Sequence, residues 1–164
     1  LVMLFVARTQ LRVMLDALRA MSWSALPLVA GLFVLVQALE KAGALVFSVD
    51  GLHRAAEWPP LAGLSAVAVG FGVLANAMNN LPMGLIGAGA VKAAHSSLTM
   101  HAAVLLGINL GPNLSVTGSL ATILWLIALR REKIAISGWQ FFRVGLIVMP
   151  PALLLAVLAL TAHY

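Results

Sequence analysis

Lys92 is the only residue with a formal charge between Leu61 and Leu129. A stretch of this length can cross a bilayer more than once, since one crossing takes about 20 apolar residues. The whole chain is 62% hydrophobic and 9% charged, whereas soluble domains carry roughly 25% charged residues. Inside lipid, backbone polar groups are satisfied within helices. The sequence therefore predicts an all-α membrane protein with several spans.

The charged residues lie in short clusters between the apolar runs. The net charge is +5, but basic clusters beside apolar runs are a topology signal, so we expect the lipid bilayer and not nucleic acid as a partner. The chain has no cysteine, which excludes disulfides and thiolate metal sites within it. No nucleophile–base pair or metal-ligand cluster stands out. We therefore expect no enzyme activity, no catalytic residues and no metal site.

The apolar runs and their polar borders divide the chain into segments. Leu1–Val6 reads as the tail of a helix and no methionine precedes it, so we expect the chain to begin within a longer fold. The predicted segments are the end of a preceding helix with an interfacial basic segment (1–22), a transmembrane helix (23–49), an external connector (50–60), a re-entrant helical hairpin (61–91), a broken transmembrane helix (102–129), a cytoplasmic connector (130–140) and a last transmembrane helix (141–162).

The hairpin prediction rests on the polar interruption Met78-Asn79-Asn80-Leu81-Pro82, which forms its tip at residues 78–82. The arm that follows, Met83–Val91, makes about 13 Å of helix at about 1.5 Å per residue. That length reaches roughly the middle of a hydrocarbon layer about 30 Å thick. A segment that folds back at Asn79-Asn80 fits this length better than a straight span.

The second interruption is Gly111-Pro112-Asn113-Leu114-Ser115-Val116-Thr117-Gly118, which we expect to unwind the helix over 111–118. The basic clusters Arg8–Arg19 and Arg130–Lys133 mark the cytoplasmic side. The hairpin then enters and leaves from outside, the broken helix runs inward, and the last helix ends outside. Without the hairpin, the two basic clusters would face opposite sides.

Both interruptions are candidates for a substrate site. Irregular backbone at membrane depth costs several kcal/mol per unsatisfied group unless it is buried or lines a cavity, and transporters place such breaks around their substrates. A single glycine or serine more often serves packing, but whole interruptions favour function. Asn76, one turn before the tip, is as consistent with packing as with function. The expected substrate-binding residues are Asn79, Asn80, Asn113, Ser115, Thr117 and Ser119, and the expected helix-breaking residues are Pro82, Gly111, Pro112 and Gly118.

The two interruptions, together with the run from Ser119 to Trp125, also resemble the signature stretches of the ArsB-type arsenite permeases of the ion transporter superfamily. The resemblance implies a pump in the bacterial cytoplasmic (inner) membrane that extrudes arsenite or antimonite. It would be driven by the proton motive force without a cofactor, and an ArsA-type ATPase is a possible partner. The chain would be the C-terminal half, the second of two inverted repeats, with the N-terminal half of the same transporter as its partner.

The sequence does not decide which residues would carry the coupling proton. Some members of that family carry an acid where this chain has Asn109, so coupling here would involve another group. Glu40 and Lys41 are the ionisable candidates within a predicted span, although a place near the outer interface favours simple solvation of both side chains.

Arsenous acid is uncharged at neutral pH and carries hydroxyl groups, which suits a neutral site of amides and hydroxyls. A dicarboxylate site would more naturally recruit Arg or Lys, but a helix N-terminus can also hold an anion. A sodium- or proton-coupled carboxylate carrier and a sodium/proton antiporter of the same superfamily therefore remain alternatives. A non-transporting membrane scaffold is a further one.

Overall fold

The computed structural model describes residues 25–163. The predicted basic segment over 1–22 lies outside the described residues. The chain has two compact units, Leu1–Gly31 and Leu32–Tyr164. The described part of the first unit is the beginning of one helix, and the second unit holds the rest of the fold.

Two helices replace the single helix predicted over 23–49. Helix α2 covers Ala25–Lys41 and α3 covers Ala44–Ala56, with a bend of 67° between them. Gly43 takes a φ of 88° at the bend, a left-handed conformation that glycine adopts without steric cost. Helix α3 also occupies most of 50–60, where the sequence predicts a connector. It is stable there because it buries one face, formed by Ser48, Leu52 and Ala55.

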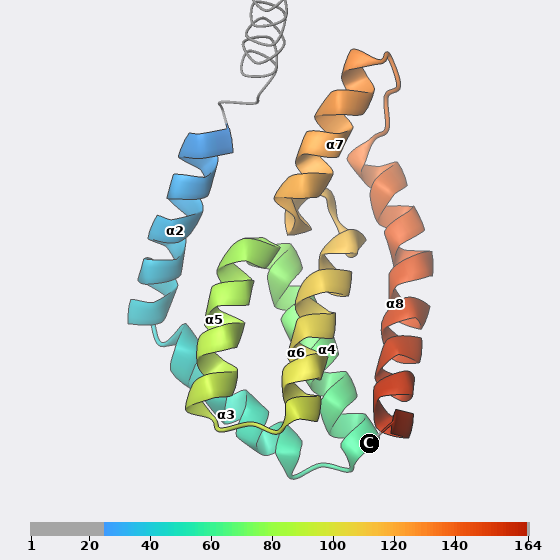
Figure 1. The fold of residues 1–164 in the computed structure, drawn as a ribbon. Coiled ribbons are helices and arrows are strands. Elements are labelled where there is room, and N and C mark those ends of the chain that lie inside the picture. Colours follow the sequence, from blue (N-terminus) through green and yellow to red (C-terminus); the bar gives the residue numbers. More distant parts are fainter. Residues whose placement is uncertain (1–24, 164) are drawn as a thin grey trace, which may run out of the picture. The chain divides into compact units, whose positions relative to one another are not determined.

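Helices α4 and α5 form a hairpin (Figure 1). Helix α4 covers Pro60–Met78 and α5 covers Asn80–Ala93, and Asn79 between them has a φ of 79° and a ψ of 150°. The second arm is longer than the predicted Met83–Val91, because Pro82 lies in the first turn of α5, where its missing N–H group is harmless. At 14 residues, this arm is about 21 Å long.

The next stretch is a helix interrupted by short turns. Helix α6 covers Leu98–Leu110, two 3-10 turns cover Gly111–Leu114 (η1) and Val116–Gly118 (η2), and α7 covers Leu120–Arg131. Helix α6 begins earlier than the predicted residue 102, because the Ser97 hydroxyl accepts a hydrogen bond from the Met100 N–H at 3.3 Å and caps it. Helix α8, Gly138–His163, closes the described chain.

Helices α4 and α6 pack closely at the centre of the second unit. A side chain on Gly107 would meet the carbonyl oxygen of Ala68, and one on Gly111 would meet the backbone of Gly72. Gly107 and Gly111 lie one turn apart, which is the small-residue spacing that lets membrane helices approach. The surrounding core contains Val67, Phe71, Met83, Ile86 and Val104.

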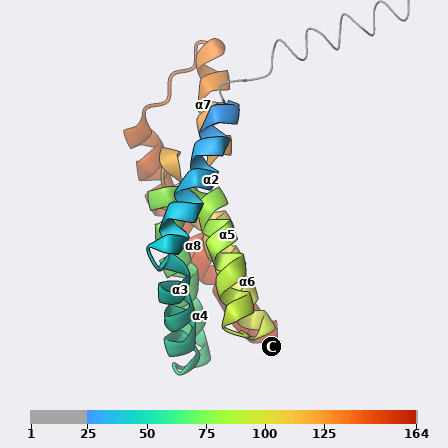
Figure 2. The same cartoon turned by 90° about the vertical axis from the view of Figure 1, so that its left-hand side faces the viewer.

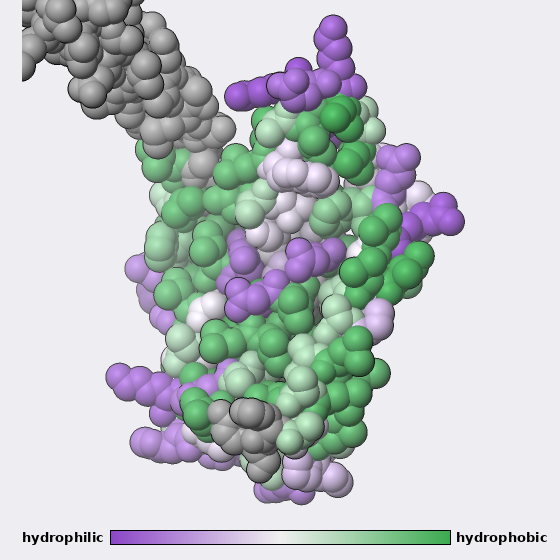
Figure 3. All heavy atoms as spheres, turned by 45° about the vertical axis from the view of Figure 1, so that its right-hand side comes forward, coloured by the Kyte–Doolittle hydropathy of each residue, from purple (hydrophilic) through white to green (hydrophobic). Residues whose placement is uncertain are grey.

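The surface of the second unit suits lipid. Figure 3 shows one face that is largely hydrophobic, with hydrophilic residues at its two ends and a hydrophilic patch in its middle. Among the described residues, two helices are long and apolar enough to span a membrane, Pro60–Met78 and Gly138–Ala162, and the bent α2–α3 pair makes a third if it counts as one span. The prediction of an all-helical membrane protein is therefore confirmed at this level.

Candidate substrate site at the helix interruptions

Asn76 joins the end of α4 to the interruption after α6. Its side-chain amide donates to the carbonyl oxygens of Gly72 at 2.8 Å and Gly111 at 2.6 Å. Its Oδ1 atom accepts a hydrogen bond from the Ser115 hydroxyl at 2.7 Å. The Thr117 hydroxyl donates to the Asn76 backbone carbonyl at 3.3 Å. Asn76 thus satisfies backbone and hydroxyl groups that the break leaves without helical partners.

Asn79 makes the second connection between the two interruptions. Its side-chain amide donates to the Thr117 carbonyl oxygen at 3.2 Å, and its Oδ1 atom accepts from the Leu81 N–H at 3.3 Å. The residue is only 8% exposed. One side chain therefore caps α5 and holds η2 against the hairpin tip.

Hydroxyl groups and the ends of two helices also lie where the two interruptions meet. The hydroxyls of Ser115 and Thr117 lie 3.2 Å apart, and the Ser119 hydroxyl accepts from the Ala121 N–H at 3.2 Å as the cap of α7. Helices α5 and α7 therefore begin next to the same residues, which points the positive ends of two helix dipoles at them. A side chain on Gly118 would meet Asn76 Oδ1 at 2.8 Å, so glycine is required for this approach.

We call Asn76, Asn79, Ser115 and Thr117 the polar cluster. Its four side chains are uncharged at neutral pH and bond to one another or to backbone groups. Pro112 and Gly111 are buried directly beside it. Asn80, the first residue of α5, is half-buried, and within residues 25–163 no hydrogen bond links its amide to another residue. The cluster can exchange hydrogen bonds with a small neutral ligand, but it offers no charge.

The side chains of Asn113 and Asn109 bond to the backbone of α6 and not to the polar cluster. The Asn113 amide donates to the carbonyl oxygens of Leu110 at 3.0 Å and Asn109 at 3.3 Å, and the Asn109 amide donates to the Leu105 carbonyl oxygen at 2.8 Å. Both residues are exposed. Asn113, one of the expected substrate-binding residues, is therefore not part of the contact between the two interruptions, because the 3-10 turn directs its amide back to α6.

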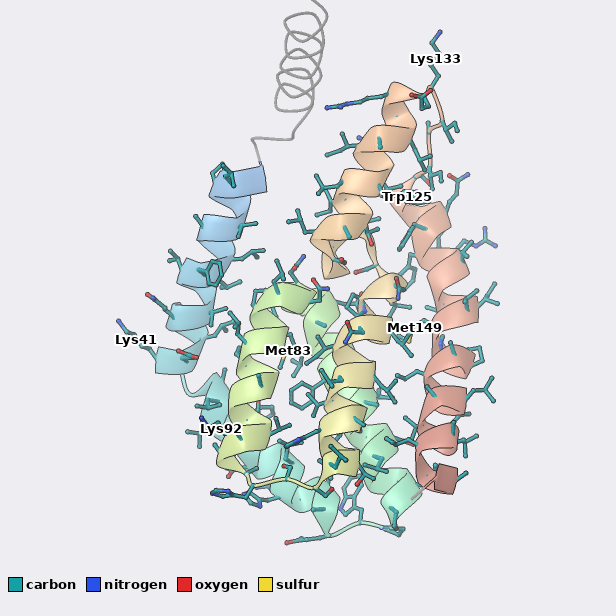
Figure 4. All side chains as sticks on the ribbon, viewed as in Figure 1. Lys41, Met83, Lys92, Trp125, Lys133 and Met149 are labelled. Carbon is teal, nitrogen blue, oxygen red and sulfur yellow. The ribbon has the colours of Figure 1, made fainter. Side chains whose placement is uncertain are left out.

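Glu40 and Lys41 are exposed at the end of α2, and Figure 4 shows Lys41 pointing away from the hairpin. No contact of the described residues joins either one to the polar cluster.

Comparison with known proteins bears on what this arrangement is for. The family described as "Arsenical pump membrane protein", ArsB, matches residues 2–164. The chain belongs to the ArsB family. An arsenical pump membrane protein of Escherichia coli is 30% identical over 151 residues, and one of Yersinia enterocolitica is 32% identical over the same length. An uncharacterized transporter of Mycobacterium tuberculosis is 32% identical over 162 residues, which cover 91% of this chain and 36% of that protein.

The ArsB match confirms the resemblance carried by the two interruptions. The alignments with the Escherichia coli and Yersinia enterocolitica proteins cover 87% of this chain and 34% of each relative, so the chain spans about a third of their length. No solved structure matches the chain.

The central place of Asn76 in this ArsB chain was missed by sequence reasoning. The signal was its position one turn before the tip, but a single asparagine in a helix gives no partner. The Gly72–Gly111 approach provides that partner, since it brings a carbonyl oxygen of the break within reach of the α4 side chain.

A groove with a volume of about 710 Å³ lies beside the break, between α7 and α8. Its lining residues include Asn113, Trp125, Gln140 and Gly145. Figure 4 shows Trp125 on the side of α7 toward α8.

Within residues 25–163, no group of three or more His, Cys, Asp or Glu side chains could hold a metal ion.

Proposed function

We propose that this chain forms the substrate-holding part of a membrane efflux transporter for the trivalent hydroxides of arsenic and antimony. The observation that carries the proposal is the direct hydrogen bonding between the two helix interruptions through Asn76, Ser115, Thr117 and Asn79. Such interruptions cost free energy in a membrane and are kept where a substrate binds. The names of the relatives in Escherichia coli and Yersinia enterocolitica supply the class of substrate.

The chemistry of the polar cluster supports a neutral substrate. Arsenous acid has three hydroxyl groups, each of which can donate and accept a hydrogen bond. Amide and hydroxyl side chains complement it without the desolvation that a charged partner would require. Four heavy atoms at a ceiling of about −1.5 kcal/mol each give roughly −6 kcal/mol, or a Kd of tens of micromolar. An efflux pump can release a ligand held this weakly.

In this proposal the substrate competes with hydrogen bonds inside the polar cluster. The Ser115 and Thr117 hydroxyls are occupied by Asn76, so an incoming metalloid hydroxide replaces these bonds with its own. The exchange loosens the contact between the α4–α5 hairpin and the α6–α7 break. Substrate binding is thereby linked to relative movement of the two elements, as alternating access requires.

The same proposal includes the membrane arrangement. The hairpin is re-entrant, α6 and α7 together make one broken span, and the chain is the second inverted repeat of a transporter in the bacterial cytoplasmic membrane. The N-terminal half completes the site, and proton antiport supplies the driving force, with an ArsA-type ATPase as an additional partner in some settings. Glu40 or Lys41 would serve coupling only through a rearrangement, since neither contacts the polar cluster in the described residues.

The test is arsenite uptake into inverted membrane vesicles that contain the complete transporter, with an imposed pH gradient, acidic inside. We expect uptake that collapses when the gradient is dissipated, and loss of uptake in Ser115→Ala/Thr117→Ala at equal expression. Uptake that is independent of the pH gradient would contradict proton antiport, and full uptake by the double variant would contradict the site.

A sodium-coupled carboxylate carrier is the second candidate. The observation that favours it is the convergence of the α5 and α7 N-termini, because helix N-termini bind anions without cationic side chains. Uptake of a labelled dicarboxylate that depends on sodium, with no arsenite uptake, would select this candidate.

A further inference from the structure

A narrow groove runs along the outer side of α3 and α4, with a volume of about 270 Å³. The lining includes Phe47, Gly51 and Arg54 from α3, Trp58 from the turn after α3, and Gly70 and Leu74 from α4. None of these residues belongs to the polar cluster. Figure 2 shows α3 and α4 side by side over this length.

The groove exists because small residues face each other across it. A side chain on Gly51 or Gly70 would meet nothing within 4 Å, so both positions are open toward the outside. Leu52 and Phe71, also on its lining, are 2% and 6% exposed and close it from beneath. The volume lies just below the roughly 300–1,000 Å³ of sites for drug-sized ligands, which favours a single hydrocarbon chain as the occupant.

The groove has a polar end and an apolar end. Phe47, Gly51 and Arg54 follow the spacing of one face of α3, and the rise from Phe47 to Arg54 is about 10 Å at about 1.5 Å per residue. Trp58 follows in the turn after α3. Arg54 and Trp58 lie beside the turn that leads to α4, whereas Phe47 and Leu74 lie at the other end. This is the polarity of a membrane amphiphile.

The charge on the groove lining favours an anionic headgroup. Arg54 is the only charged residue on the lining, since Asp50 and Glu57 are exposed but do not line the groove. An arginine binds phosphate through several N–H donors. Trp58 beside it is 54% exposed, and tryptophan is typical of the boundary between headgroups and hydrocarbon.

We propose that this groove binds one anionic phospholipid. The phosphate lies at Arg54, Trp58 contacts the glycerol region, and one acyl chain follows Gly51 and Gly70 toward Phe47 and Leu74. The lipid covers the base of the α4–α5 hairpin, and this role is independent of which substrate the polar cluster takes.

The test uses the fluorescence of Trp58 in the complete transporter, reconstituted in phosphatidylcholine bilayers. The Trp58 signal is the difference between the parent protein and Trp58→Phe. Phosphatidylglycerol with brominated acyl chains is added at increasing mole fraction, and brominated phosphatidylcholine is added in a parallel series. We expect half-quenching at about fivefold lower mole fraction of phosphatidylglycerol, the factor that about 1 kcal/mol for one basic residue at an anionic lipid gives.

Two kinds of variant separate the headgroup from the chain. Arg54→Gln should remove the fivefold preference, whereas Lys92→Gln, an exposed charge outside the groove, should keep it. Gly70→Leu fills the groove and should also remove the preference, whereas Ala62→Leu, an exposed residue of α4 outside the lining, should not. Gly51→Leu is the second filling variant in case Gly70→Leu fails to fold.

Equal quenching by the two lipids in the parent protein would overturn the proposal, because Trp58 would then report only the surrounding bilayer. Absence of quenching by either lipid would also overturn it, because a protein segment would then cover the groove. Preference that survives both Arg54→Gln and a folded groove-filling variant would place the anionic lipid elsewhere.

Discussion

The Ser115 hydroxyl donates to Asn76 Oδ1 over 2.7 Å, so a residue of the α6–α7 break bonds directly to a residue near the end of α4. The Asn76 amide holds the same break through the Gly111 carbonyl oxygen. The hairpin and the broken helix are thereby one hydrogen-bonded element at their meeting point. A substitution that disrupts the hairpin tip should therefore also disturb the helix break, and the reverse.

Asn76→Leu should reduce both stability and transport. The substitution removes the side-chain partner of the Gly111 carbonyl oxygen, at a cost of about 1–3 kcal/mol if that oxygen stays unsatisfied. It also leaves the Ser115 hydroxyl with Thr117 as its remaining partner. From sequence alone, Asn76 is as consistent with packing as with function. Thermal unfolding of the purified transporter and vesicle flux measure the two effects. The matched control is Asn109→Leu, which removes only an exposed bond within α6; equal losses in the two variants would contradict a special role for Asn76.

Asn79→Gly and Asn79→Ala should differ in stability. The backbone at Asn79, with a φ of 79° and a ψ of 150°, lies in a region that glycine adopts readily and that costs other residues about 1–3 kcal/mol. Both variants lose the bonds to Thr117 and Leu81, so both should transport poorly. The alanine variant alone carries the added strain and should unfold at a lower temperature. If alanine proved at least as stable as glycine, the hairpin tip would not have this backbone conformation.

Gly111→Ala should destabilise the fold by about 1–3 kcal/mol or more, because the added methyl group meets the Gly72 backbone, which cannot move aside as a side chain can. Gly107→Ala should act in the same way against the Ala68 carbonyl oxygen. Gly70→Ala is the control, since a side chain there meets nothing within 4 Å. Melting temperatures in detergent give the comparison, and similar values for all three variants would argue against the close α4–α6 contact.

Lys92 and Lys133 should be reached from opposite sides of the membrane. Figure 4 places these residues at opposite ends of the second unit, with the hairpin tip between them, and the basic cluster at Arg130–Lys133 marks the cytoplasmic side. This chain contains no cysteine, so Lys92→Cys and Lys133→Cys can be labelled with an impermeant thiol reagent in intact cells and in inverted vesicles. Labelling of both from the same side would rule out the single broken span formed by α6 and α7.

Arsenate and phosphate should compete poorly with arsenite for transport. The polar cluster has no cationic side chain to balance an anion, whereas antimonite, a neutral hydroxide like arsenite, should compete well. Initial rates of arsenite uptake with each competitor at equal concentration provide the measurement. Effective competition by arsenate would instead favour binding at the helix N-termini and the anion carrier.

Much of the fold class was readable from the chain because it depends on composition and local backbone chemistry. Few charges and long apolar runs determine an all-helical membrane protein whatever the packing. The α-helix ends at Met78 and at Leu110, next to Asn79 and Gly111-Pro112. The motifs there were long enough to predict the ArsB family, which the match over residues 2–164 confirms.

Other features depended on partners distant in sequence or on one dihedral angle. The bend at Gly43 was missed because a single glycine in an apolar run also fits a straight helix, and only the burial of Ser48, Leu52 and Ala55 on α3 makes the bend favourable. Asn113 was predicted alongside Ser115 and Thr117 as a substrate-binding residue because a motif gives no side-chain direction. The 3-10 turn decides that direction and bonds its amide to α6.

The sequence by itself determined that the chain lies in lipid and carries uncharged polar residues next to proline and glycine, since these properties follow from residue types and their neighbours. Only the tertiary structure decided that Asn76 is the centre of the polar cluster. The reason is physical: its partners Gly111 and Ser115 come within hydrogen-bonding distance only because Gly72, Gly107 and Gly111 let α4 and α6 approach. That approach is a property of two packed helices and of neither one alone.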